Sequence, residues 1–250
     1  EPYFTTWRNS NHIVDTKTTW AMKTIEREAF PYQVTPSTHA GLEEKKLHLI
    51  ADQNFKNIQI YYGNWRKRYP EWILYPYEQT IFIHLFQFSG TAALAHASAV
   101  EIDGKGYLFL GDSGAGKSTI STFMEQRLGK GRIFSDDRIV IRRNGDRWWL
   151  FGTPWPGSFA RICPEGCEIG GMYFLEQTAE HEMEILTPMQ AIQRLLPVVF
   201  GTWWLPERLE QHMSFISQIA AQKQFPLCRL GFRNDISVVD FFQKENGKIG

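Results

Sequence analysis

A glycine-rich segment in the middle of the chain has the composition and spacing of a phosphate-binding loop. Residues 111–118 read GDSGAGKS, which fits the pattern G-x-x-x-x-G-K-[ST]. In such a loop, backbone amides surround phosphate oxygens, the lysine contacts the β- and γ-phosphates, and the hydroxyl can ligate Mg²⁺. The pattern predicts ATP and Mg²⁺ as cofactors and a nucleotide site made of Gly111, Asp112, Ser113, Gly114, Ala115, Gly116, Lys117, Ser118 and Thr119.

Two adjacent acids, Asp136 and Asp137, follow the next predicted strand. Neighbouring carboxylates repel each other unless a cation or a hydrogen-bond donor is close. In a kinase, one such acid can accept the proton of the acceptor hydroxyl while the other orients the metal. The pair is therefore a candidate catalytic and metal-binding group, and an exposed polar turn is the alternative interpretation.

His96 is the third candidate for the site. It precedes a predicted hairpin of residues 97–102 and 106–110, whose Asp-Gly turn allows the positive φ values that tight hairpins need. The hairpin brings the start of its first strand next to the end of its second, and hence places His96 beside the loop. An ordinary core or surface histidine is the alternative.

The elements around these residues predict an α/β fold with a mixed sheet. A hairpin makes the strand before the loop antiparallel to its neighbour, unlike the strands of a purely parallel nucleotide-binding sheet. An amphipathic helix is expected over residues 117–128. Further strands are expected at 57–62, 71–74, 132–134, 138–143, 148–151, 227–232 and 236–240, and further helices at 42–52, 77–95, 188–199 and 206–222.

Composition limits the classes of function. The 250 residues carry 27 basic and 27 acidic side chains, so no charge surplus indicates nucleic acid as a partner. No apolar run is long enough for a membrane span. Three cysteines are too few for a disulfide framework and favour a reducing, cytoplasmic location. We expect an N-terminal accessory region over residues 1–90 and the kinase domain over 91–250.

The string HASAVEIDGKGYLFLGDSGAGKST (residues 96–119), followed by FSDD (134–137), resembles the catalytic domain of the HPr kinase/phosphorylase family. That family shares a nucleotide-binding core with the phosphoenolpyruvate carboxykinases. The resemblance covers roughly residues 90–145 and implies a P-loop kinase core with a mixed sheet and flanking helices. It implies catalytic roles for His96, Lys117 and the Asp136–Asp137 pair, with Asp137 as general base and Ser118 as a magnesium ligand.

One family signature, EIRGLG, is not intact. The nearest string is CEIGG at residues 167–171, which lacks the arginine and leaves Glu168 as a further candidate metal ligand. This departure puts in doubt both the phosphorylase reaction and HPr as substrate. The stiff loop TPWPGS at residues 153–158 either lines the acceptor site or packs as a turn.

Together these observations predict an ATP- and Mg²⁺-dependent kinase of a hydroxyl, with a serine of a protein or peptide as the expected acceptor. A small-molecule hydroxyl kinase and a nucleotide-sensing module without catalysis are the alternatives. The strings N-K-x-D and L-S-G-G-Q do not occur, which disfavours a GTPase switch and a transport ATPase. Homo-oligomerisation is left open.

Overall fold

The chain divides into two compact units, one of Glu1–Ser89 with Thr202–Glu210 and one of Gly90–Gly201 with Gln211–Gly250. The predicted division near residue 90 differs from this one in Thr202–Glu210, which the prediction places in the second unit. The computed structural model describes residues 12–15, 20–36, 48–61, 77–128, 132–154, 157, 163, 165–202 and 205–249.

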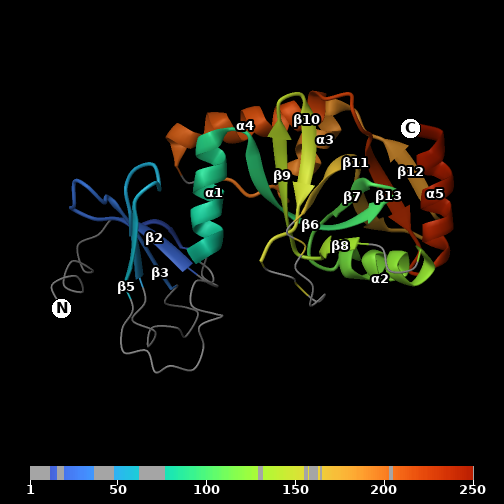
Figure 1. The fold of residues 1–250 in the computed structure, drawn as a ribbon, viewed down its shortest axis with the longest axis horizontal. Helices are drawn as coiled ribbons and strands as arrows, with labels where there is room; N and C mark the ends of the chain where they lie inside the picture. Colours follow the sequence, from blue (N-terminus) through green and yellow to red (C-terminus); the bar gives the residue numbers. More distant parts are fainter. Residues whose placement is uncertain are drawn as a thin grey trace, which may run out of the picture. The chain divides into compact units, whose positions relative to one another are not determined.

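The first unit contains an antiparallel sheet with the strand order β1-β2-β3-β4-β5 and the helix α1 (Figure 1). Met22, Val34, Leu49 and Phe55 are buried in its core. The elements are β1 (His12–Asp15), β2 (Trp20–Thr24), β3 (Tyr32–Pro36), β4 (His48–Ala51), β5 (Ile58–Tyr61) and α1 (Tyr77–Ser89).

The helix predicted over residues 42–52 is wrong where the structure describes it, because His48–Ala51 is strand β4. Leu49, Ile50 and Ala51 are all buried. The strand therefore lacks the alternation of buried and exposed positions that would distinguish it from a helix. Residues 42–47, and the strand predicted at 71–74, lie outside the described ranges.

The second unit is built on a mixed sheet with the order β10-β9-β6-β7-β11-β13-β12, and β8 pairs with β6. Strand β11 runs parallel to both β7 and β13, whereas β6 and β7 are antiparallel. The mixed sheet predicted from the hairpin is thus confirmed. Its strands are β6 (Ala92–Ile102), β7 (Lys105–Leu110), β8 (Arg132–Ser135), β9 (Arg138–Asn144), β10 (Arg147–Phe151), β11 (Gly166–Gln177), β12 (Glu182–Ile185) and β13 (Leu227–Phe232).

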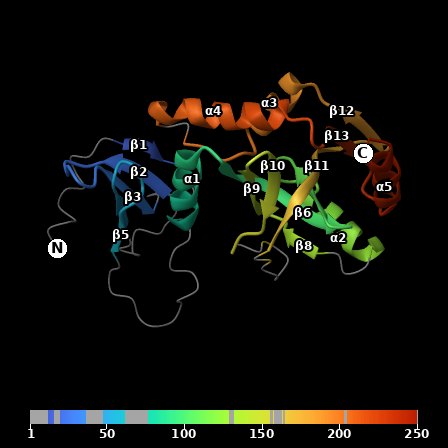
Figure 2. The same ribbon diagram turned by 45° about the horizontal axis from the view of Figure 1, so that its top comes forward.

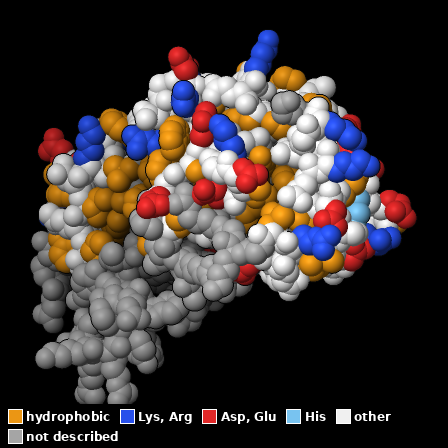
Figure 3. Space-filling view, turned by 45° about the vertical axis from the view of Figure 1, so that its right-hand side comes forward, with side chains coloured by type: hydrophobic (Ala, Val, Ile, Leu, Met, Phe, Trp, Pro, Cys, Tyr) orange, Lys and Arg blue, Asp and Glu red, His pale blue; other side chains and the backbone are white. Residues whose placement is uncertain are grey.

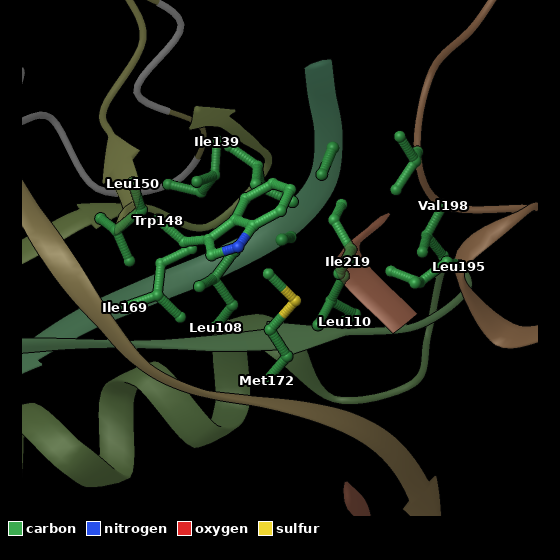
Figure 4. Packing of buried hydrophobic residues seen from close by; sticks show 14 of the residues in the cluster. Leu108, Leu110, Ile139, Trp148, Leu150, Ile169, Met172, Leu195, Val198 and Ile219 are labelled. Carbon is green, nitrogen blue, oxygen red and sulfur yellow. The ribbon is translucent and has the colours of Figure 1, made fainter. Parts of the chain in front are cut away.

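Helices cover both faces of this sheet (Figures 1 and 2). Side chains alternate along β7, where Leu108 and Leu110 belong to one apolar cluster and Phe109 to the other. Figure 4 shows residues of the first cluster, Trp148 among them. Helices α3 and α4 contribute to the first cluster and α2 and α5 to the second, with the bounds α2 (Lys117–Leu128), α3 (Pro188–Leu195), α4 (Pro206–Ala221) and α5 (Ser237–Ile249).

Two predictions differ from the structure here: one helix was extended too far, and one strand is a helix. The helix expected up to residue 95 ends at Ser89, and Gly90, with a φ of 64°, follows it. Positive φ at such a position terminates a helix, and β6 begins two residues later, at Ala92. The strand expected at 236–240 is the start of α5, whose Ser237 N–H donates to Asp235 Oδ1 at 3.0 Å and caps the helix.

Strand β11 was not predicted at all, although it lies between β7 and β13. Both of its faces are covered, so its central residues form an almost continuous buried run. Within the described ranges, no helix is both long and apolar enough to cross a membrane. Figure 3 shows basic and acidic side chains interspersed over the visible face, which agrees with the zero net charge.

Candidate active site

The hairpin of β6 and β7 brings the glycine-rich loop to one end of the sheet. Its turn, Asp103-Gly104, has φ values of 51° and 79°, as the sequence predicted for this tight turn. Ala97 of β6 pairs with Leu110 of β7. His96 therefore lies beside the point where β7 ends and residues 111–116 begin.

The backbone conformation of the loop requires glycine at two positions. Gly114 and Gly116 have φ values of 86° and 103°, a region that other residues rarely adopt. A Cβ atom on Gly116 would also lie 2.5 Å from the ring of Phe232. The loop leads directly into the N-terminus of α2, where the helix dipole favours an anion.

Lys117, the first residue of α2, folds back into the loop. Its Nζ donates to the carbonyl oxygens of Gly111 and Asp112 at 2.8 and 2.9 Å. Burial lowers the pKa of Lys117, and the negative charges of Asp137 and Asp112 oppose that shift. The ammonium group is therefore held inside the curve of the loop, where it can contact a bound anion.

The first acid of the pair contacts the loop helix. Asp136 lies in the bend between β8 and β9 and is buried. Ser118 Oγ donates to Asp136 Oδ2 at 2.7 Å. A hydroxyl and a carboxylate oxygen, from two separate segments of the chain, thus meet at the mouth of the loop.

The second acid lies between a histidine and an arginine. Asp137 Oδ1 is 3.5 Å from His96 Nε2 and accepts a hydrogen bond from Arg138 Nη1. The hydroxyl oxygen of Ser135 accepts hydrogen bonds from the backbone N–H groups of Asp137 and Arg138, at 3.1 and 3.2 Å. These bonds fix the bend that turns the two acids toward the loop.

His96 is half-buried, and its environment favours the neutral imidazole. Burial lowers its pKa below the ordinary value of 6.5, and the charges of Lys117 and Arg138 lower it further. The negative charges of Asp137 and Asp112 act in the opposite direction. The ring is therefore uncharged at neutral pH and can exchange a proton with a neighbouring group.

These side chains line one pocket of about 390 Å³. It contains most of the residues expected from the sequence, whereas Gly111, Asp112 and Ala115 belong to the loop without lining the pocket. Gly157, from the TPWPGS loop, also lines it, so this part of that loop lies at the site. The lining residues are His96, Ser113, Gly114, Gly116, Lys117, Ser118, Thr119, Asp136, Asp137, Gly157 and Gln177.

Two residues in or beside the pocket were missed. Gln177 ends β11 and donates from Nε2 to the carbonyl oxygen of Gly114 at 3.0 Å. Recognition of β11 would have found it, because residues at the carboxyl ends of parallel neighbours lie at the same edge. Arg138 carries no motif, and only its position after the two acids could have indicated it.

Glu168 does not belong to this pocket, and the expectation that it holds metal there is wrong. It pairs in register with Lys105 at the start of β7, and Lys105 Nζ lies 2.8 Å from its carboxylate. The loop begins at the other end of β7, about 17 Å away along the strand. Among the described side chains, no group of three or more His, Cys, Asp or Glu residues is arranged to hold a metal ion.

Comparisons with known proteins give a limited result. No family model matches the chain, and a search of curated proteins finds no match. A search of solved structures finds the HPr(Ser) kinase/phosphatase from Coxiella burnetii, with a TM-score of 0.34 and 12% sequence identity. That match covers 61% of this chain and 97% of the other. A similarity of this size does not assign the chain to a family or an activity.

Proposed function

We propose that the second unit is an ATP- and Mg²⁺-dependent kinase that transfers the γ-phosphoryl group to a hydroxyl, with a serine of a protein or peptide as the acceptor. One observation carries the proposal. The two acids of the β8–β9 bend and the glycine-rich loop, from separate segments of the chain, line the same pocket. A phosphate-binding loop alone would support only nucleotide binding.

The residues of the loop fit a triphosphate. The glycines at positive φ, the N-terminus of α2 and the buried ammonium group of Lys117 all favour an anion at this position. Ser118 Oγ and Asp136 Oδ2, 2.7 Å apart, are the hard oxygen ligands that Mg²⁺ prefers. A Mg²⁺ ion held by these two oxygens would neutralise negative charge on the phosphate oxygens.

The transfer step uses the second acid as the proton acceptor. The acceptor oxygen attacks the γ-phosphorus while the bond from that phosphorus to the β,γ-bridging oxygen breaks. ADP leaves with the bridging oxygen, and the hydroxyl proton passes to a carboxylate oxygen of Asp137. Lys117 stabilises the negative charge that develops on the phosphoryl oxygens.

A binding module without catalysis has no use for this second acid. Ser118 and Asp136 suffice for a metal, and Lys117 for the phosphates. Asp137 adds a second carboxylate to the pocket, beside Arg138 and a neutral histidine. Phosphate binding does not need this carboxylate, whereas transfer to a hydroxyl needs a proton acceptor. The pair of acids therefore favours a transferase.

The experiment is an acceptor screen. The full chain is incubated with Mg²⁺-ATP and a library of serine-containing peptides, and products are detected by the mass of an added phosphoryl group. Lys117→Met should reduce transfer by about 100-fold or more, because it removes a cation from the developing charge. Lys105→Met, at a surface lysine of the same hairpin, is the matched control and should leave transfer unchanged.

Two results would contradict the proposal. One is a wild-type chain that does not bind Mg²⁺-ATP. The other is a Lys117→Met variant that transfers phosphoryl groups as fast as the Lys105→Met variant.

A further inference from the structure

Arg138 follows the acid pair and has no part in the chemistry described so far. It is the first residue of β9 and pairs in register with His96 of β6. Residues directly opposite each other on antiparallel strands project from the same face of the sheet. The arginine and histidine side chains therefore emerge side by side, next to the pocket.

Asp137 is held between these two side chains by one of its oxygens. Arg138 Nη1 donates to Asp137 Oδ1 and also to the carbonyl oxygen of Asp137 at 3.0 Å, and His96 Nε2 lies 3.5 Å from the same Oδ1. In the described part of the chain, the Asp137 side chain makes no other hydrogen bond. Oδ2 is therefore the oxygen left to face a ligand in the pocket.

The arginine is itself fixed in place. Its side chain is only 15% exposed, and its guanidinium carbon lies 4.8 Å from the centre of the Phe200 ring, a cation–π contact. The hydroxyl of Thr153 donates to the Arg138 carbonyl oxygen at 3.0 Å. The Nε atom of Arg138 is buried and has no hydrogen-bond partner among the described residues. A buried polar atom without a partner lowers stability, a cost more typical of functional positions than of structural ones.

We propose that Arg138 is a positioning residue for phosphoryl transfer: it holds Oδ1 of Asp137 so that Oδ2 faces the acceptor hydroxyl and receives its proton. The inference rests on the proposed function of the pocket. It adds that the orientation of the base depends on a guanidinium that makes no hydrogen bond or ion pair with the described residues of the nucleotide loop or with the expected metal ligands. The permanent positive charge of Arg138 also offsets the two adjacent carboxylates.

The test compares Arg138→Gln, Arg138→Lys and the control Arg142→Gln, which removes an exposed arginine from the same strand. Arg138→Gln should bind Mg²⁺-ATP within about twofold of wild type yet lose about 100-fold in transfer to the peptide found in the screen, because the base is misplaced. Arg138→Lys keeps the charge without the planar donor geometry and should lose about tenfold. Arg142→Gln should match wild type.

A second readout does not depend on activity. Because the charge of Arg138 helps to lower the pKa of His96, an NMR titration of the His96 ring should give a higher pKa in Arg138→Gln than in wild type. The opposing and assisting charges of Asp137, Asp112 and Lys117 remain in both proteins. An unchanged titration would show that the guanidinium does not act on His96 and would contradict the arrangement of Arg138, Asp137 and His96 on which the proposal rests.

The outcomes separate the two proposals. Equal transfer by Arg138→Gln and wild type overturns the positioning role alone, as does a loss of ATP affinity that accounts for the whole loss of rate. If Arg138→Gln fails to fold, as judged by thermal unfolding, Arg138→Lys decides, and its equality with wild type overturns the role. A wild-type protein that neither binds nor uses Mg²⁺-ATP overturns the proposed function, and the His96 titration still tests the arrangement of Arg138, Asp137 and His96.

Discussion

Adding a single methyl group at Gly157 should disable the site. A Cβ atom there would lie 1.9 Å from Asp136 Oδ1 and 3.0 Å from its Cγ. Ordinary contacts between carbon and oxygen are longer by more than 1 Å, so the carboxylate of Asp136 must move by about that distance. Asp136 is buried and bonded to Ser118, so the movement breaks the 2.7 Å hydrogen bond between the two expected metal ligands.

Gly145 provides a matched control. Its φ of 60° is close to the 65° of Gly157, but a Cβ atom at Gly145 meets nothing within 4 Å. Alanine should therefore cost about 1–2 kcal/mol of backbone strain at Gly145, measured as the free energy of unfolding in urea, and more at Gly157, where the clash with Asp136 adds to the strain. Only Gly157→Ala should also affect the site.

The assay measures ATP affinity with and without Mg²⁺, together with the rate of phosphoryl transfer. In Gly157→Ala we expect a loss of the Mg²⁺-dependent part of the affinity and a rate about 100-fold below that of Gly145→Ala, as is typical of a 1 Å misplacement of a reacting group. Equal affinity and equal rate in the two variants would refute the role given to Asp136.

Three further predictions concern single side chains. Ser118→Ala should raise the Mg²⁺ concentration for half-maximal transfer about tenfold, because one oxygen ligand is lost; a magnesium titration tests this. Gln177→Leu should weaken ATP binding about threefold in calorimetry, because the hydrogen bond to the Gly114 carbonyl is lost. Burial lowers the pKa of His84 to about 3, so the unfolded chain binds a proton below pH 6.5 that the folded chain does not. The free energy of unfolding of the first unit should therefore fall by about 2 kcal/mol between pH 7 and pH 5, and by much less in His84→Gln, as measured by urea unfolding at both values.

The part of the site that could be predicted depends on local sequence. The Asp103-Gly104 turn, the loop glycines and the helix over residues 117–128 are encoded by nearest neighbours, because positive φ and helix initiation are local requirements. The structure has all three, and its two acids and His96 line the same pocket as the loop.

The parts that could not be predicted depend on tertiary burial. The central residues of β11 are buried on both faces and have no period-2 pattern, and the omission of this strand also concealed Gln177 at its end. Glu168 was expected to be a metal ligand because its string resembles a family signature, but the parallel register of β11 and β7 puts it at the end of β7 away from the loop. The alanine-rich start of β6 looks helical because alanine has the highest helix propensity, a local preference that burial within the sheet overrides.

The central claim is that Asp137 and the glycine-rich loop act on one bound ATP. Single-turnover transfer from γ-labelled ATP, with the enzyme in excess, tests it most directly in wild type and in Asp137→Asn. The account predicts that both proteins bind Mg²⁺-ATP with similar affinity and that only the wild type passes the label to the acceptor at an appreciable rate. Labelled product formed equally fast by Asp137→Asn would contradict it.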